Sequence, residues 1–310
     1  MKSKTAKMGV AVFILFALIP LYLYFYHAGA KENGNKEIVG QQKEGTKTGK
    51  KGEEKKVSAV SLDKEKNPSP KIGEVELEKS KVVSDPKGTA AAEEEKAVPS
   101  GFLVVIDPGH QERANLEKEP IGPGGTETKI KVTGGTSGVT TGKPEYKLTL
   151  EASLILGELL ESRGGKVIYT RTSHNVNLSN RDRAEIANEN HADLFIRVHA
   201  DGSTDRNVRG FSVLTPAKSS PYTKAIFEDS LKASQFIIDE TSKNAAVKVN
   251  GISYRGDMTG FNWSKVPCTL VEIGFMTNPT EEKNLSDTVY LTKLLTNVAD
   301  GISDYANYKE

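Results

Sequence analysis

Residues 100–310 predict a layered α/β domain in which a mostly parallel, twisted sheet is flanked by helices. Short, uncharged apolar runs alternate along this part of the chain with longer amphipathic segments, and turn residues separate the two. Continuous apolar runs are typical of strands that are covered on both faces. A regular alternation of strands with helices favours parallel pairing of the strands.

The apolar runs define the strands in chain order. Residues 101–106 (GFLVVI) form the first predicted strand, and 166–170, 193–198, 210–214 and 268–271 form the others. Helices are predicted at 145–163, 178–188, 221–242 and 288–305. In the first helix Leu148, Ile155 and Leu159 lie on one stripe, and two glycines at 164–165 provide a stop signal.

Residues 1–30 have a different character. Three lysines precede an uncharged apolar run at 9–26, whose ~18 residues approach the length of a bilayer-spanning helix. Lysines before such a run favour a cytoplasmic N-terminus and export of the chain after the run. We favour an uncleaved transmembrane anchor because the run is longer than the usual signal-peptide core of ~7–15 residues. The alternative is a cleaved signal peptide with a site at 28–30 and a product secreted to the cell wall.

Residues 31–99 are rich in Lys, Glu, Gly, Ser and Pro and contain no aromatic residue. Such a segment cannot bury enough apolar surface to offset its conformational entropy, so we expect a disordered, charged linker. The predicted organisation is therefore an anchor or signal peptide at 1–30, a linker at 31–99 and a folded domain at 100–310. The folded domain would lie on the extracytoplasmic side of the cytoplasmic membrane.

Composition excludes two classes of function. Lys and Arg total 42 and Asp and Glu total 41, and a net charge of +1 is unsuited to neutralising a nucleic-acid backbone. Cys268 is the single cysteine and lies in an apolar run, so we expect a buried thiol and no cysteine-based metal cluster. Any metal site must use His, Asp or Glu, and the chain has five histidines.

Polar side chains with suitable chemistry follow three of the predicted strands. His110 comes just after the first strand, His199 closes another, and Glu272 ends a third. Functional crevices in open α/β sheets lie at the carboxyl ends of the strands, and Glu145, which opens a helix, can join this edge. The spacing alone leaves ordinary interpretations open: a hydrogen-bonded core histidine, a first-turn carboxylate or a Glu–Lys pair.

The folded domain resembles the zinc-dependent N-acetylmuramoyl-L-alanine amidases of bacteria along nearly its whole length. The resemblance rests on ordered blocks that include VIDPGH at 105–110, ADLFIRVHA at 192–200 and VEIGFMTN at 271–278. Further matches are the helix start at Glu145, residues 167–171, residues 183–188 and residues 266–267. By this resemblance His110, Glu145 and His199 are the ligands of one Zn²⁺ ion, and Glu272 is the catalytic carboxylate. The implied substrate is peptidoglycan, cut between N-acetylmuramic acid and L-alanine.

The chain also departs from the family pattern. A long glycine-rich segment, residues 111–144, separates His110 from Glu145, either as a substrate-binding loop or as an ordinary surface insertion. Asp201 stands where an asparagine is expected, and Arg197 replaces a small polar residue. We expect Arg197 to form an ion pair rather than a substrate contact. Trp263 either forms a wall for the substrate or anchors its own loop.

Two rival functions are compatible with the same residues. One is another extracytoplasmic zinc peptidase, because the same ligand set serves related hydrolyses. The other is a catalytically silent wall-binding or regulatory module, although such a module has no need of a general base at Glu272. The sequence identifies no activating protein partner.

Overall fold

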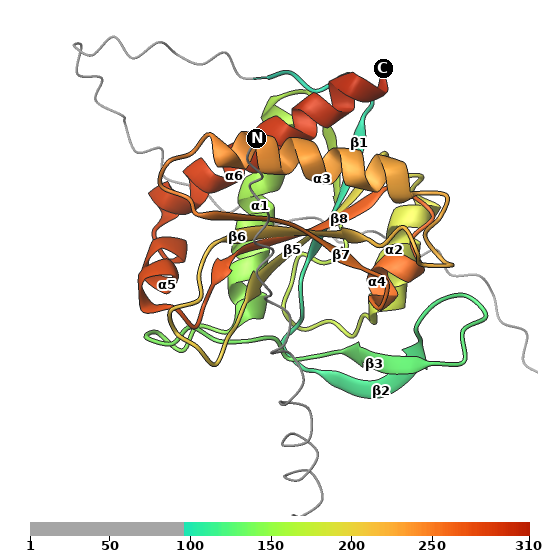
Figure 1. Cartoon of the computed structure of the whole chain (residues 1–310), viewed down its shortest axis with the longest axis horizontal. Helices are drawn as coiled ribbons and strands as arrows, with labels where there is room; N and C mark the ends of the chain where they lie inside the picture. Colours follow the sequence, from blue (N-terminus) through green and yellow to red (C-terminus); the bar gives the residue numbers. More distant parts are fainter. Residues whose placement is uncertain (1–95) are drawn as a thin grey trace, which may run out of the picture. The chain divides into compact units, whose positions relative to one another are not determined.

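The computed structural model describes residues 96–310 (Figure 1). The predicted anchor or signal peptide and the linker up to residue 95 lie outside these residues. Lys96 forms ion pairs with Glu240 and Asp304, and the amide of Val98 donates to Arg163 O at 2.9 Å. Residues 96–99 therefore pack on the folded domain rather than belonging to the linker. Within 96–310 no helix combines the length and apolar composition that a bilayer crossing requires.

The centre of the domain is a six-stranded sheet, and it confirms the predicted α/β class. Its spatial order is β4 (Lys166–Tyr169), β1 (Leu103–Pro108), β5 (Leu194–Asp201), β8 (Cys268–Phe275), β6 (Phe211–Pro216) and β7 (Val249–Arg255). Every neighbouring pair is parallel except β6 with β8. The carboxyl ends of β1, β5 and β8 consequently lie at one edge of the sheet, as the sequence predicted.

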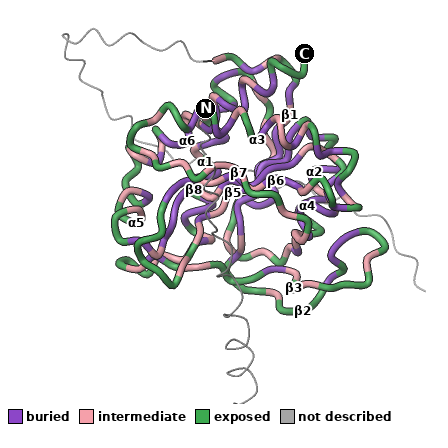
Figure 2. The backbone as a smooth tube through the Cα atoms, in the orientation of Figure 1, coloured by how far each residue is buried: buried purple, intermediate pink, exposed green. Residues whose placement is uncertain are grey.

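Helices cover both faces of the sheet. One face carries α1 (Glu145–Ser162), α3 (Phe227–Ser242) and α6 (Thr288–Lys309), and the other carries α2 (Asn180–Glu189) and the short α4 (Thr259–Asn262). The remaining helix, α5 (Pro279–Leu285), follows β8. Figure 2 shows the buried residues concentrated in the central strands. Alternate residues of β1 divide between the two cores, with Val104 and Ile106 on one side and Val105 on the other.

Three strands were missing from the prediction. β2 (Asn115–Pro120) and β3 (Thr128–Val132) form a separate antiparallel hairpin, seen below the main sheet in Figure 1. Their sequences carry mixed charges, so no apolar run marked them. β7 is one of the two edge strands of the sheet and is largely exposed or half-buried, which leaves its sequence (VNGISYR) without a periodic signal.

A buried ion network fixes the carboxyl end of β1. The carboxylate of Asp107, which is fully buried, accepts hydrogen bonds from Arg183 of α2 at 2.7 Å and Arg197 of β5 at 2.8 Å. Thr170, just after β4, also donates to it at 2.5 Å. Burial alone would raise the pKa of Asp107, but the two guanidinium groups and Thr170 outweigh burial and hold it well below its usual range.

This network predicts a specific loss of stability in acid. An aspartate in the unfolded chain has a pKa of about 3.9, above the folded pKa of Asp107. The contribution of Asp107 to the free energy of unfolding is therefore complete at neutral pH and is lost as the pH falls below the unfolded pKa. Asp107→Asn should lower the free energy of unfolding by about 3–5 kcal/mol at pH 7, because two buried guanidinium groups lose their partner. Denaturant unfolding across pH 3–7 measures the free energy of unfolding of wild type and of Asp107→Asn. The difference between the two free energies should narrow toward acid.

The control for this prediction is Asp229→Asn, which breaks the half-exposed pair between Asp229 and Lys309 and should cost about 0–1 kcal/mol. If Asp107→Asn does not fold, Thr170→Val removes one bond to the same carboxylate and should cost about 1 kcal/mol. If the difference in free energy of unfolding between wild type and Asp107→Asn stays constant between pH 7 and pH 3, the stabilising role of ionised Asp107 is wrong.

Candidate metal centre

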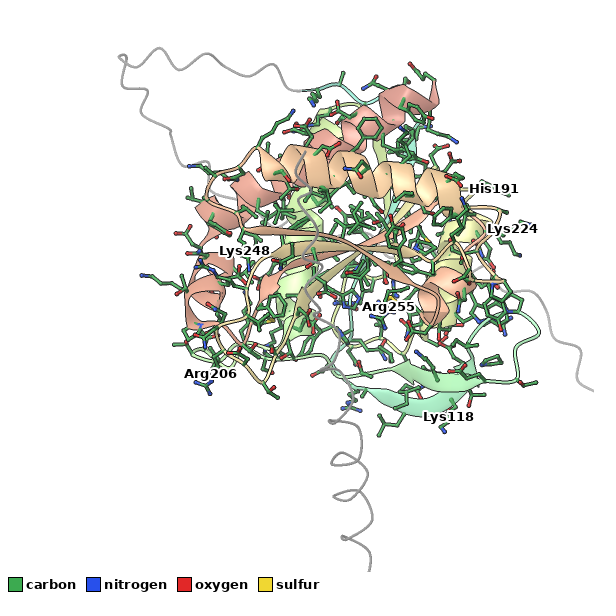
Figure 3. All side chains as sticks on the ribbon, viewed as in Figure 1. Lys118, His191, Arg206, Lys224, Lys248 and Arg255 are labelled. Atoms are coloured by element: carbon green, nitrogen blue, oxygen red, sulfur yellow. The ribbon has the colours of Figure 1, made fainter. Side chains whose placement is uncertain are left out.

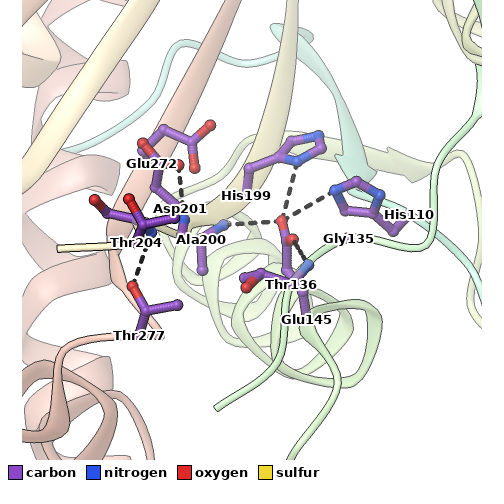
Figure 4. A pocket seen from close by; sticks show the side chains of 12 residues that line it. His110, Gly135, Thr136, Glu145, His199, Ala200, Asp201, Thr204, Glu272 and Thr277 are labelled. Atoms are coloured by element: carbon purple, nitrogen blue, oxygen red, sulfur yellow. Dashed lines mark hydrogen bonds and ion pairs between the residues drawn. The ribbon is translucent and has the colours of Figure 1, made fainter. Parts of the chain in front are cut away.

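A cavity of about 500 Å³ lies at the edge of the sheet where β1, β5 and β8 end. It is lined by His110, Gly135, Thr136, Glu145, His199, Ala200, Asp201, Gly202, Ser203, Thr204, Glu272 and Thr277. All four site residues predicted from the sequence are among them (Figure 4). Residues far apart in the chain therefore meet at one point, as strand-end placement predicted.

Three of these side chains form a cluster that suits a metal ion. Oε1 of Glu145 lies 3.2 Å from Nε2 of His110 and 3.2 Å from Nδ1 of His199. Ligand atoms at about 2.0–2.2 Å from a tetrahedral zinc ion are about 3.3–3.6 Å apart, so these two separations are close to the edges of such a site. One ligand atom from each of the three residues lies within 4.8 Å of the others.

The backbone places His110 in an unusual conformation. Its φ angle is +59°, in the left-handed region that costs a non-glycine residue about 1–3 kcal/mol. Arg183 stabilises this conformation by donating to the carbonyl oxygen of His110 at 3.0 Å. On the ring, Nδ1 lies 2.9 Å from the carbonyl oxygen of Thr133. A carbonyl oxygen only accepts, so Nδ1 carries the proton and Nε2 is free for a metal.

Gly109 allows the two histidines to approach. A Cβ atom built at Gly109 would lie 2.5–2.7 Å from the ring atoms of His199, closer than any real contact. The imidazole of His199 therefore packs directly on the backbone of the segment that carries His110. The two rings are 4.8 Å apart between centroids, at an angle of 78°.

Glu145 is oriented by backbone amides on both of its oxygens. Oε2 accepts from the amide of Thr136 at 2.9 Å, and Oε1 accepts from the amide of Ala200 at 3.2 Å. Glu145 is also the first residue of α1, where a carboxylate interacts favourably with the helix dipole. The side chain is 3% exposed, so solvent does not compete for these bonds.

The protonation states match those of metal ligands. Burial lowers the pKa of His199 to about 4, although Glu145 opposes this shift, so the imidazole is neutral at pH 7. Burial would raise the pKa of Glu145, but the adjacent imidazoles of His110 and His199 outweigh it and hold the pKa well below its usual range. His199 Nε2 is buried and has no hydrogen-bond partner within residues 96–310. A neutral imidazole and an ionised carboxylate are the forms that bind zinc.

Glu272 lies beside the cluster on the next strand. It pairs in register with His199 across β5 and β8. Its Oε2 atom is buried and has no hydrogen-bond partner in the described part of the chain. Burial, together with the negative charges of Glu145 and Asp201, raises the pKa of Glu272 well above its usual range. A carboxylate with these properties is a ready proton acceptor next to the candidate metal position.

Two backbone groups at the site, the carbonyl of Thr133 and the amide of Thr136, could not be recognised from side chains in the sequence. Gly135 and Thr136 of the segment 133–144 line the cavity, and a Cβ at Gly135 would be 2.7 Å from Glu145 Oε2. Within this segment Thr133 and Thr136 act through backbone atoms. The glycine-rich segment at 111–144 thus contains both the β2–β3 hairpin and a loop that lines the cavity. Asp201, noted in the sequence as a departure, also lines the cavity.

The other residues singled out from the sequence have structural contacts. Arg197 pairs with Asp107, as expected. Trp263 donates from Nε1 to Pro120 O at 2.9 Å, and the guanidinium of Arg181 lies 4.0 Å from its ring centroid, so it anchors the hairpin. Cys268 is buried, which raises the pKa of its thiol to about 12. Another of the five histidines, His191, is exposed and lies away from the cluster (Figure 3).

Comparisons with known proteins agree with this geometry. The model of the N-acetylmuramoyl-L-alanine amidase family (Amidase_3) matches residues 104–304. An N-acetylmuramoyl-L-alanine amidase of Mycobacterium tuberculosis is 30% identical over 228 residues, which cover 70% of this chain and 87% of that protein. The probable cell wall amidase LytH of Staphylococcus aureus is 26% identical over 213 residues, covering 68% of this chain and 61% of LytH.

Solved structures show the same fold. The crystal structure of an N-acetylmuramyl-L-alanine amidase from Mycobacterium smegmatis has a TM-score of 0.61 and 26% identity, covering 67% of this chain and 98% of that one. The apo form of the corresponding enzyme from Mycobacterium abscessus has a TM-score of 0.60 and 28% identity, covering 67% and 99%. With a family model that spans most of the folded domain, this chain belongs to the N-acetylmuramoyl-L-alanine amidase family.

Proposed function

We propose that this chain is a zinc-dependent amidase that hydrolyses the bond between N-acetylmuramic acid and the L-alanine of the stem peptide in peptidoglycan. The observation that carries the proposal is the convergence of His110, Glu145, His199 and Glu272 on one cavity in a member of this family. A silent wall-binding module would have no use for a Glu272 carboxylate whose buried Oε2 atom lacks a partner in residues 96–310, beside a metal-ligand cluster.

The donor set fits zinc. Two imidazoles and one carboxylate leave a coordination position open, which is how hydrolytic rather than structural zinc sites are built. We assign Nε2 of His110, Nδ1 of His199 and a carboxylate oxygen of Glu145 as the ligand atoms, because these atoms already face one another. When bound, zinc supplies a water molecule that ionises near neutral pH and a positive charge that polarises the scissile carbonyl.

We assign Glu272 the role of general base and then general acid. Its carboxylate takes a proton from the attacking water and returns it to the amine of L-alanine as the amide bond breaks. Its Oε2 atom has no hydrogen-bond partner among the described residues, so it is available to accept this proton. His110, Glu145 and His199 would hold the ion and do not move protons, and the backbone around them orients their ligand atoms.

Release of stem peptides from purified peptidoglycan tests the activity. The purified protein, stripped with a chelator and reloaded with zinc, should release peptides that begin with a free L-alanine amine, which mass spectrometry of the products identifies. The stripped protein should be inactive, because no Lys or Arg of residues 96–310 lines the cavity to replace the positive charge of the ion. His199→Ala is the matched loss-of-ligand control. Cleavage elsewhere in the stem peptide would favour the rival peptidase.

Glu272→Gln separates proton transfer from metal binding. The variant should keep zinc, since Glu272 is not one of the three ligands, and should lose about 10²–10⁴-fold in kcat. Zinc content and initial rates of product release on the same preparation measure the two properties. Glu158→Gln, an exposed glutamate of α1, is the control and should keep full activity. Near wild-type turnover in Glu272→Gln would remove it from the mechanism.

We also propose that the enzyme acts on the outer side of the cytoplasmic membrane, held there by residues 1–30. The support is the lysine-flanked apolar run at 9–26 and a substrate that lies outside the cell. In cells, the full chain should sediment with membranes and be degraded by protease added to intact protoplasts. A chain lacking residues 9–26 should stay in the cytoplasmic fraction. A secreted product that begins after residue 30 would instead establish the cleaved signal peptide.

A further inference from the structure

The loop of residues 133–144, which we call the strap, holds two metal-ligand candidates by backbone atoms. It connects β3 to α1. At its start the carbonyl of Thr133 fixes the ring of His110, and the amide of Thr136 donates to Glu145 Oε2 at 2.9 Å. The amide of Glu145 in turn donates to Thr136 O at 2.9 Å. The position of the strap therefore sets the orientation of both ligands.

Beyond Thr136 the strap closes into a turn. Ser137 and Pro144 form an antiparallel bridge at its base, and Gly138 exchanges bonds with Lys143 and Gly142 inside it. Thr136 and Glu145 are the next residues outward from this bridge, one on each side of the turn. A displacement of the turn therefore shifts the two hydrogen bonds that join Thr136 and Glu145.

One buried carboxylate fixes the turn from outside. Glu282 of α5 is 2% exposed, and its oxygens accept from the amides of Thr140 at 2.6 Å and Thr141 at 2.8 Å. The hydroxyl of Thr141 adds a third bond at 2.6 Å. A Cβ atom at Gly138 would overlap the Glu282 carboxylate, so the turn is packed directly on it. Figure 1 shows the strap running in green from β3 to a point beneath α5.

Other charged contacts to the strap are weaker. Lys143 pairs with Glu151 on α1, but the carboxylate of Glu151 is 53% exposed and the pair is open to solvent. Three charge-assisted bonds to one buried carboxylate are less easily replaced by water. Glu282 is therefore the main side chain that holds the turn, beside the backbone bond from Val139 N to Met276 O at 3.0 Å.

We propose that Glu282 is a positioning residue for the metal centre, although it contacts neither the metal ligands nor the cavity. By fixing the strap it holds Thr133 O and Thr136 N where they orient His110 and Glu145. This inference rests on the proposed zinc function. Loss of the Glu282 carboxylate should therefore weaken zinc binding, since partners that orient metal ligands typically contribute 10–100-fold to metal affinity.

The neighbouring residue offers a matched control. Glu281 is on the same helix and also accepts backbone bonds, from Gly210 at 2.8 Å and Phe275 at 2.8 Å, but it holds ends of β6 and β8 instead of the strap. Glu282→Gln and Glu281→Gln are equal chemical changes at adjacent positions. In Glu282→Gln an amide NH₂ must face one of the strap donors, which displaces the turn.

The experiment measures zinc affinity of the full chain by competition with a chromogenic chelator, together with Tm and amide hydrogen exchange of residues 136–145. Glu282→Gln should bind zinc about tenfold or more weakly than wild type and exchange faster in the strap. Glu281→Gln should bind zinc as wild type does, whatever its Tm. If Glu282→Gln does not fold, Thr141→Val removes one strap bond and should give a smaller loss in the same direction.

The outcomes separate the two proposals. Wild-type zinc affinity and strap exchange in Glu282→Gln, or losses equal to those of Glu281→Gln, overturn the positioning role while the proposed function stands. A wild-type protein that does not bind zinc overturns the proposed function, and the metal role of Glu282 with it. A selective loss of zinc affinity in Glu282→Gln at a Tm matching Glu281→Gln supports the inference, because a merely structural residue would not distinguish them.

Discussion

The buried carboxylate of Asp107 is the interaction on which the site depends. It lies at the carboxyl end of β1 and joins guanidinium groups from α2 and β5, so one residue ties three elements together. Arg183 uses its second nitrogen to hold the carbonyl of His110, three residues further on. The same ion network that stabilises the sheet edge therefore stabilises the left-handed backbone at a metal-ligand candidate. A strained conformation of this kind persists only where its surroundings over-determine it.

From this anchor the site is supported on two sides. The sheet side supplies Gly109, on which the ring of His199 packs, and the amide of Ala200, which donates to Glu145. The opposite side is the strap, which contributes the carbonyl of Thr133 and the amide of Thr136. Both supports act through backbone atoms, so the orientation of the ligands depends on where loops lie more than on which side chains they carry.

That distinction explains what the sequence could predict. His110, His199 and Glu272 each follow an apolar run, and strand-end placement predicted their convergence. Their spacing covers most of the domain, so the ligand set came from family resemblance and not from periodicity. The glycine-rich composition of 111–144 indicated a possible loop at the site, but the contacts of the strap could not be predicted because they are made by backbone atoms. The β2–β3 hairpin was missed because its exposed strands carry mixed charges, and β7 was missed because a largely exposed or half-buried strand lacks an alternating pattern.

Charge is divided across the sheet edge in a way that suits the proposed reaction. The arginines of the network point to Asp107 and to backbone carbonyls, and no Lys or Arg lines the described cavity. The cavity instead gathers the carboxyl groups of Glu145, Asp201 and Glu272 around two imidazoles. Without a cation these groups repel one another, which is one cause of the raised pKa of Glu272. Such a cavity favours a divalent ion and an amine leaving group, and it gives no counter-charge to an anion.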